Sequence, residues 1–203
     1  MKVDEGVAGA MAGESTGSGP VGRVGNPPGI GLFDLLREDL RANGGTIFEQ
    51  GFWADAVHRF GNWQAGLRWK VVRGPLTILY RVLYLFVECA AGISLPYTIR
   101  LGRRVRIWHH GGIILLARSI GDDVQIRQNT TMGIASVDRH LDIPTIGDRV
   151  DIGCGACILG GVTVGDDCKI GANAVVLIDV PAGSTAVGVP ARVVRRRGSE
   201  AGP

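Results

Sequence analysis

Two adjacent histidines, His109 and His110, lie between Trp108 and a pair of glycines, Gly111 and Gly112. An imidazole can be neutral near pH 7 and can then take a proton from a hydroxyl group, so a histidine suits general-base catalysis. Neighbouring residues of a strand point to opposite faces, so we expect only one of the two histidines to face a given site. The glycines would let a substrate approach the backbone closely.

A polar segment further along the chain, residues 136–144, contains Asp138, Arg139 and His140 and ends in a proline. Loops on rigid scaffolds often carry binding or catalytic residues, so this segment is a second candidate for function. An ordinary solvated loop would have the same composition, and both interpretations stay open.

Cys154 and Cys157 have the spacing of redox and zinc motifs. The sequence has no second pair with this spacing and no nearby histidine pair that would complete a zinc site. A periodic pattern around the two cysteines explains their spacing more simply.

That pattern is a repeat of six residues, in which aliphatic residues recur without a slip at Ile146, Ile152, Ile158, Val164, Ile170 and Val176. A small or apolar residue, such as Ala156 or Cys168, follows four positions after each of them. Residues four apart share one face of a strand, and the glycines of the repeat favour a turn after each short strand. The pattern therefore predicts triangular coils, stacked about 4.8 Å apart as parallel strands with the aliphatic residues inside.

The same period appears earlier, in one run from Leu95 to Ile113 and in another from Ile120 to Met132. Fourteen residues separate Met132 from Ile146, two more than two repeats. We expect the polar segment with Asp138, Arg139 and His140 to leave the coils there as a loop.

The chain before the repeats is of a different kind. Residues 1–30 are rich in Gly, Ser and Pro and predict a disordered tail, while residues 31–92 show helical spacing of apolar residues. The apolar stretch from Pro75 to Leu95 includes Arg81 and Glu88, which favours a buried or groove-lying helix over a membrane span. Peripheral contact with a membrane remains an alternative. A basic start followed by an apolar region is absent, so we expect a cytoplasmic protein.

The composition sets weak limits. The 203 residues have a net charge of +3 and are 45% hydrophobic, which is enough for a compact domain with a smaller appendage. Such a mild charge does not require nucleic acid, and we expect none as a partner; an anionic ligand is equally compatible.

The repeat resembles that of hexapeptide acyltransferases, and more narrowly the chain resembles serine acetyltransferases and their relatives in polysaccharide gene clusters. The resemblance rests on Leu36–Leu40, on Tyr97–Ile113 and on the segment TAVGVPARVV at residues 185–194. It implies a mainly β fold, a left-handed parallel β-helix preceded by a small α-helical region. The expected parts are a tail (1–30), a helical region (31–92), the β-helix acyltransferase domain (93–182) and a C-terminal segment on the CoA side with a basic tail (183–203).

The resemblance implies an acetyl-CoA-dependent O-acetyltransferase in which His109 acts as the general base of a direct transfer. L-Serine, as in cysteine biosynthesis, is the first expected acceptor, and a sugar hydroxyl is the alternative. Two other classes stay open. A metal enzyme like the γ-type carbonic anhydrases would use His109, His110 and His140, and a scaffold without catalysis would use none of them. The GVPAR motif favours CoA, and no metal is expected.

Further site residues follow from the same resemblance. Arg139 would hold the carboxylate of the acceptor, with Asp138 and His140 beside it. Ser94, fifteen residues before His109, and Trp108 stand where the family has acidic residues. A serine can hydrogen-bond the imidazole but carries no charge, and an indole can stack on a sugar face. Both departures weaken the case for serine and strengthen the alternative of a sugar acceptor.

For acetyl-CoA, the expected contacts are Gly111, Gly112, Cys154, Ala172 and Arg192, and the basic run at 195–197 could meet its phosphates. The resemblance also implies a homotrimer or a dimer of trimers with the active site between neighbouring chains.

Overall fold

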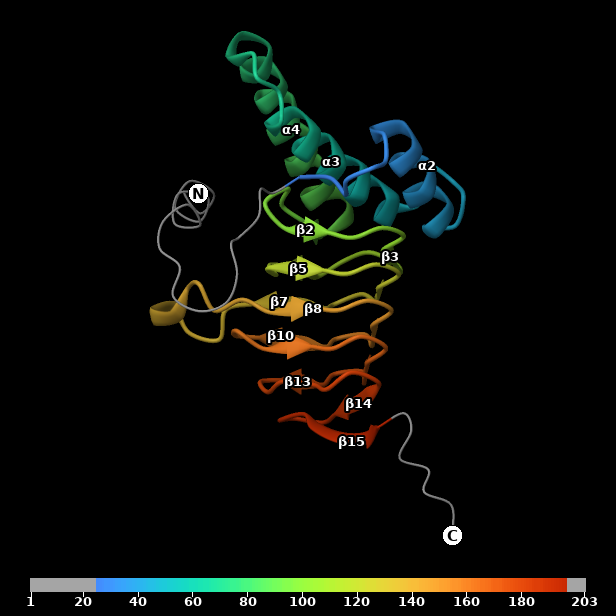
Figure 1. Cartoon of the computed structure of the whole chain (residues 1–203), viewed down its shortest axis with the longest axis vertical. Coiled ribbons are helices and arrows are strands. Elements are labelled where there is room, and N and C mark those ends of the chain that lie inside the picture. The colour runs from blue at the N-terminus through green and yellow to red at the C-terminus, as the bar shows by residue number, and fades with distance from the viewer. Residues whose placement is uncertain (1–24, 197–203) are drawn as a thin grey trace.

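The computed structural model describes residues 25–196, with the exception of the side chains of Lys70, Arg195 and Arg196. Most of the expected disordered tail (1–24) and the end of the basic run (Arg197) lie outside the described residues. Three helices form a cap on one end of a long three-sided prism of short strands (Figure 1).

The cap consists of α2 (Leu32–Ala42), α3 (Gln50–Ala65) and α4 (Lys70–Ala91). Gly44 and Gly45 follow α2 with φ of +95° and +77°, a left-handed conformation that favours glycine and turns the chain towards α3. Gly92 ends α4 in the same way, with φ of +64°, and its N–H donates to the Glu88 carbonyl at 3.0 Å. α3 packs against both α2 and α4.

The prism has three faces, each a sheet of mainly parallel strands, and each coil contributes one strand to each face. The β1 face contains β1 (Ile93–Ser94), β4 (Ile113–Leu115), β7 (Thr131–Gly133), β10 (Cys157–Leu159) and β13 (Val175–Val176). The β2 face contains β2 (Arg100–Leu101), β5 (Ser119–Ile120), β8 (Thr145–Ile146) and β11 (Thr163–Val164). The β3 face contains β3 (Arg106–Ile107), β6 (Gln125–Ile126), β9 (Asp151–Ile152), β12 (Lys169–Ile170), β14 (Ser184–Val187) and the antiparallel β15 (Arg192–Arg196).

The aliphatic residues of the repeat stack inside the prism as the six-residue period predicts. Ile126 pairs with Ile152, which pairs with Ile170, and all three are buried. Each such side chain contributes about 1.5–3 kcal/mol when it leaves water. The small second residue of the repeat fits the narrow interior, and Ala156 and Cys168 are fully buried. All four cysteines are free.

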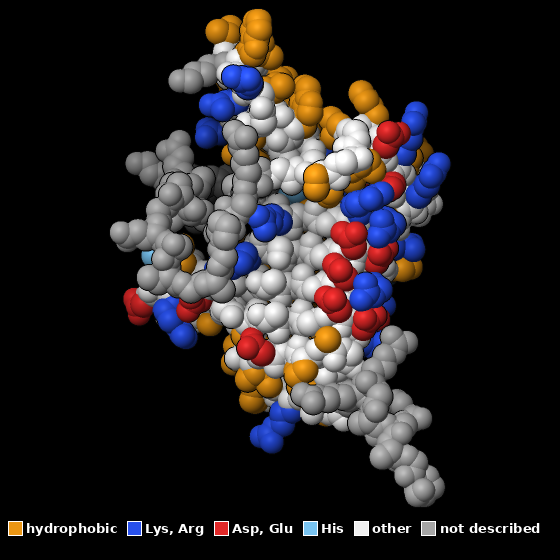
Figure 2. All heavy atoms as spheres, in the orientation of Figure 1, with side chains coloured by type: hydrophobic (Ala, Val, Ile, Leu, Met, Phe, Trp, Pro, Cys, Tyr) orange, Lys and Arg blue, Asp and Glu red, His pale blue; other side chains and the backbone are white. Residues whose placement is uncertain are grey.

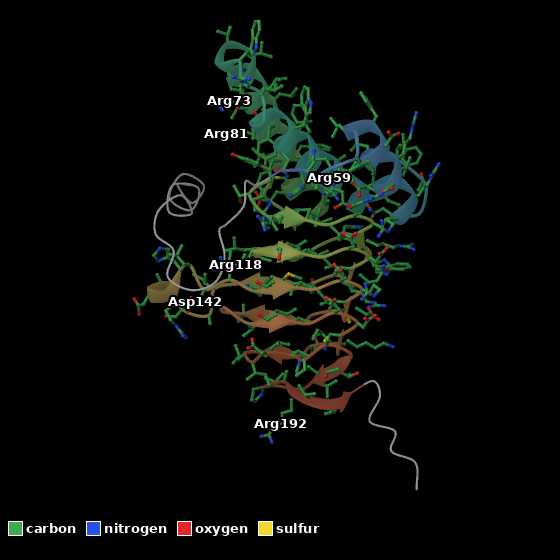
Figure 3. All side chains as sticks on the ribbon, viewed as in Figure 1. Arg59, Arg73, Arg81, Arg118, Asp142 and Arg192 are labelled. Atoms are coloured by element: carbon green, nitrogen blue, oxygen red, sulfur yellow. The ribbon has the colours of Figure 1, made fainter. Side chains whose placement is uncertain are left out.

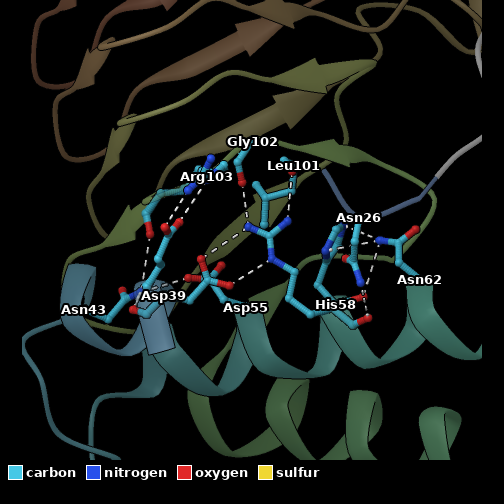
Figure 4. A network of polar contacts seen from close by, with 12 residues as sticks. Asn26, Asp39, Asn43, Asp55, His58, Asn62, Leu101, Gly102 and Arg103 are labelled. Carbon is cyan, nitrogen blue, oxygen red and sulfur yellow. Dashed lines mark hydrogen bonds and ion pairs between the residues drawn. The ribbon is translucent and has the colours of Figure 1, made fainter. Parts of the chain in front are cut away.

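A buried polar network joins the cap to the first coils (Figure 4). The guanidinium of Arg59 in α3 pairs with Asp39 of α2 at 2.8 Å and donates to the carbonyl oxygens of Leu101 and Gly102 at 2.9 and 2.5 Å. Asp39 and Arg59 are both inaccessible to solvent. These bonds hold α2 and α3 against β2 and the turn that follows it.

Asn43 and His58 extend the network. Asn43 donates to the Asp55 carboxylate at 2.8 Å and accepts the backbone N–H of Ile107 at 3.1 Å, and a ring nitrogen of His58 lies 3.0 Å from the Ile99 carbonyl oxygen. Burial lowers the pKa of His58 to about 3 and raises the pKa of Asp55 well above its usual range.

The helix expected to be buried is only half covered. Among the described residues one segment, Val71–Ala91 of α4, is long and apolar enough to cross a membrane by length and composition, and only 17% of the window that qualifies is buried. Tyr80, Val87 and Ala91 form its buried side, whereas Ile78 and Val82 on the other side are 66% and 60% exposed. The apolar sequence therefore predicted the helix but not its exposure.

Candidate active site

His109 lies in the turn between β3 and β4, at the edge where the β3 face meets the β1 face. Each later coil passes the same edge. Backbone N–H groups of one turn donate to carbonyl oxygens of the turn before it: Asn129 to Gly111 at 3.1 Å, Gly155 to Gln128 at 3.0 Å and Asn173 to Cys154 at 2.8 Å. We call this stack of turns the histidine edge; it comprises residues 108–112, 127–130, 153–156 and 171–174.

Six of the predicted site residues lie on the histidine edge: Trp108, His109, Gly111, Gly112, Cys154 and Ala172. His109 is exposed and has a left-handed φ of +63°. Its ring makes no hydrogen bond to any residue in the described part of the chain. His110 is exposed as well. The edge thus presents an accessible base, with Gln128 in the next coil and the small residues Cys154 and Ala172 in the two coils after it.

The two glycines beside the base have different surroundings. Gly111 donates its N–H to the Ala91 carbonyl at the end of α4, at 2.8 Å, so this N–H is already used. Gly112 has a φ of +66°, and a Cβ there would lie 2.5 Å from Asn129 Oδ1. Within residues 25–196 no acceptor takes the N–H of Gly112, which leaves it able to stabilise an oxyanion.

Ser94 does not contact the base. Its hydroxyl lies 2.7 Å from the Tyr84 hydroxyl of α4, and no hydrogen bond joins it to His109 among the described residues. The expected serine–histidine contact is therefore not made in this structure, because the serine is engaged by the helix that packs on β1.

Trp108 points along the β3 face. Its indole N–H donates to Gln125 Oε1 at 2.8 Å, and the Arg106 guanidinium lies 3.3 Å from the ring centroid in a cation–π contact. One ring face is thus covered by Arg106, so that stacking on a sugar would have to use the other.

The Asp138 loop leaves the prism at another edge. Asp138 and Arg139 belong to the short 3-10 helix η1 (Val137–Arg139), in the connection from β7 on the β1 face to β8 on the β2 face. Figure 1 shows this loop projecting from the side of the prism. Asp138, Arg139 and His140 are exposed, and Arg139 has Asp142 as its ion-pair partner at 3.8 Å. Within one chain the loop is not brought to His109.

Arg192 begins β15, the antiparallel strand that closes the β3 face, and its side chain is exposed (Figure 3). β14 precedes it, and Val187 of β14 pairs with Arg192. Among residues 25–196 no group of three or more His, Cys, Asp or Glu side chains is placed to hold a metal ion.

Gln128 is a candidate site residue that was not predicted from the sequence. It lies on the histidine edge, in the coil beneath His109, and its carboxamide oxygen is buried without a hydrogen-bond partner among the described residues. A buried acceptor without a donor is costly, so this oxygen is suited to receive one from a ligand. The only sequence signal was its place in the repeat, twenty-six residues before Cys154.

The family model for the bacterial transferase hexapeptide (six repeats) matches residues 143–177. The serine acetyltransferase of Helicobacter pylori is 42% identical over 117 residues, which cover 57% of this chain and 68% of that protein. The chain belongs to the serine acetyltransferase family. It is therefore an acyltransferase of the hexapeptide class, and the expected fold, a left-handed parallel β-helix with a small helical region before it, is confirmed.

Solved structures of serine acetyltransferases have a fold similar to that of this chain. Soybean serine acetyltransferase complexed with serine has a TM-score of 0.66 and 32% identity, over 80% of this chain and 69% of that one. A serine acetyltransferase in complex with CoA has a TM-score of 0.64 and 29% identity, over 80% and 69% of the two chains.

Proposed function

We propose that this protein transfers the acetyl group of acetyl-CoA to the hydroxyl of L-serine, with His109 as the general base. The observation that carries the proposal is the histidine edge, where a chain of the serine acetyltransferase family exposes a histidine, with small residues two and three coils further along. Acetyl-CoA is the co-substrate, and its small-molecule acceptor is recognised at the same edge.

The chemistry needs no covalent enzyme intermediate. His109 takes the proton of the acceptor hydroxyl as its oxygen bonds to the thioester carbonyl carbon. The resulting oxyanion accepts a hydrogen bond from the Gly112 N–H. When the tetrahedral species collapses, the carbon–sulfur bond breaks and the CoA sulfur leaves with the proton that His109 had held.

The pantetheine arm of CoA would run down the edge past Cys154 and Ala172 towards Arg192. Small residues leave room for the arm, and the buried oxygen of Gln128 can accept an amide N–H from it. An arginine at the far end suits a phosphate group.

Arg139 is the proposed partner of the serine carboxylate, with Asp138 and His140 beside it. Since their loop leaves the prism at a different edge from His109, a complete site requires the loop of a second chain. We therefore include a homotrimer, or a dimer of trimers, in the proposal. The proposal also includes a cytoplasmic location for the protein.

A sugar hydroxyl is the second candidate acceptor, with the same mechanism. The observation that favours it is the absence of the two family carboxylates, since Ser94 is bonded to Tyr84 and Trp108 offers an aromatic face instead of a charge. In that case Trp108 would stack on the sugar ring.

Release of the CoA thiol from acetyl-CoA, with and without L-serine, tests the assignment. We expect strong serine-dependent release. Binding of acetyl-CoA without serine-dependent release would reject serine as the acceptor, and release on addition of a saccharide would then establish the second candidate.

A further inference from the structure

α4 has two apolar sides, and the described residues, 25–196, cover only one of them. Tyr80, Val87 and Ala91 are buried where α4 packs against α3 and β1. With about 100° between successive helical residues, Ile78 and Val82 lie on the opposite side. We call the uncovered surface the exposed stripe; its members are at least 46% exposed and are Val71, Val72, Ile78, Leu79, Val82, Leu85 and Phe86.

The exposed stripe reaches the free end of the molecule. In Figure 1, α4 extends beyond the other two helices at the end opposite β15. Val71 and the adjoining Trp69 at this end are 87% and 77% exposed. A large contiguous apolar surface marks a site of contact with another molecule or with a membrane.

The charge around the stripe indicates what covers it. From Gly66 to Val87 the sequence contains four basic residues, Arg68, Lys70, Arg73 and Arg81, and no Asp or Glu. Figures 2 and 3 show Arg73 and Arg81 on one side of α4 and hydrophobic side chains along the other. At about 100° per residue Arg81 borders the exposed stripe next to Leu85, whereas Arg73 falls on the Tyr80 side. Glu88 follows the stripe in the last turn of α4. An apolar stripe with a basic flank is the pattern of helices that lie in the headgroup region of anionic membranes.

Two other occupants fit this surface less well. A second copy would bring two equally basic flanks together, and like charges facing each other oppose association. A membrane span would expose all sides of α4 to lipid, whereas its Tyr80 side is committed to α3 and the prism.

We propose that α4 docks this protein on the surface of bilayers that contain anionic lipids, with the exposed stripe at the boundary between headgroups and acyl chains. The Ala91 carbonyl at the end of α4 accepts the Gly111 N–H of the histidine edge at 2.8 Å, so docking would hold this edge at a fixed distance from the lipid. The proposal is independent of the acceptor.

Co-sedimentation of the full chain with lipid vesicles tests it. We expect binding to vesicles of phosphatidylglycerol and phosphatidylcholine, and at least about tenfold weaker binding to phosphatidylcholine alone, since the basic flank then loses its counter-charge. Ile78→Glu and Val82→Glu should each weaken binding about tenfold or more, because a charge replaces a lipid-contacting side chain. The double variant Arg68→Glu, Arg73→Glu alters no apolar residue. It should also weaken vesicle binding about tenfold or more, and its vesicle binding should no longer depend on the salt concentration.

Ile178→Glu is the matched control, since Ile178 is also exposed, at 47%, but lies at the far end of the prism. It should bind vesicles like the unmodified protein, and thermal unfolding followed by circular dichroism should show that every variant is folded. The proposal is overturned if the full chain does not sediment with anionic vesicles, or if the α4 variants and Ile178→Glu behave alike. It is also overturned if sedimentation velocity shows self-association that Val82→Glu abolishes while vesicle binding is unchanged.

Discussion

Histidine occurs both at the junction between the cap and the prism and at the histidine edge. Its side chain is buried at the junction and exposed at the edge. At the junction His58 is buried, with a ring nitrogen 3.0 Å from the Ile99 carbonyl, and Arg59 is paired with Asp39. At the edge His109 and His110 are exposed, and no described residue hydrogen-bonds to their rings.

The two regions differ in exposure, since the junction buries its polar groups and the edge leaves its imidazoles open to solvent and to other molecules. Buried polar groups must find partners inside the protein, because water is not available to them. Buried oxygens without a partner among residues 25–196 occur in both regions, Gln128 Oε1 at the edge and Asp55 Oδ1 and Asn62 Oδ1 at the junction, but only the edge has an exposed imidazole. The junction therefore holds the cap on the prism, and the edge is the place where a histidine is open to a ligand.

The largest effect is expected from Arg59→Met, which leaves the Asp39 carboxylate buried without its partner. We predict a loss of about 3–5 kcal/mol in the free energy of unfolding, measured by urea denaturation. Arg149→Ala is the matched control, since Arg149 pairs with Asp167 at 2.9 Å with side chains 50% and 36% exposed. It should cost at most about 1 kcal/mol, and equal costs for the two variants would contradict the comparison.

Gly112→Ala tests the edge. A Cβ there meets Asn129 Oδ1 at 2.5 Å and the backbone has a positive φ, so we expect a loss of stability of about 1–3 kcal/mol and a lower kcat/KM. Gly45→Ala has the same kind of strain, with a φ of +77°, but its Cβ meets nothing within 4 Å. Gly45→Ala should retain full kcat/KM; an equal loss of activity in both variants would argue against a special role of the edge.

The pH dependence of stability tests the buried histidine. The pKa of His58 is lowered to about 3, whereas an unfolded histidine has a pKa near 6.5, so between these values the unfolded state binds more protons. Stability should therefore fall as the pH drops below about 6.5, by up to about 1.4 kcal/mol per pH unit from this group.

His58→Gln is the variant that isolates this contribution. A glutamine can still donate to the Ile99 carbonyl but does not titrate, so its stability should fall less steeply over the same range. The raised pKa of Asp55 acts with the opposite sign in both proteins and leaves the difference unchanged. Parallel curves of unfolding free energy against pH would refute the assignment of a buried, neutral His58.

The smallest effect is expected from Ser94→Ala. Its hydroxyl is bonded to Tyr84 and not to His109, so the variant should lose about 0.5–1.5 kcal/mol of stability and little activity. Steady-state kinetics would check this. A drop in kcat as large as that of a general-base variant would mean that Ser94 orients the base after all.

The prism could be predicted from the sequence because its period is local. Ile126, Ile152 and Ile170 occupy the same repeat position, and their parallel register follows from it. The gathering of His109, Cys154 and Ala172 on one edge is a consequence of the same geometry.

The rest depends on contacts between distant residues, which a local pattern does not encode. Arg59 reaches carbonyl groups more than forty positions away, and Ser94 is taken by a helix whose packing side was not evident. The apolar sequence of α4 did not reveal which side would be covered, since both sides are apolar.

The central claim is tested most directly by serine-dependent CoA release from His109→Ala and from His110→Ala, side by side. The two residues are adjacent and both exposed, but only His109 has a left-handed φ, so thermal unfolding should first show that both variants are folded. If His109 is the general base, His109→Ala should lose about 10²–10⁴-fold in kcat while His110→Ala stays within a few-fold of the unmodified protein. Equal activity in the two variants, or a larger loss in His110→Ala, would contradict the assignment.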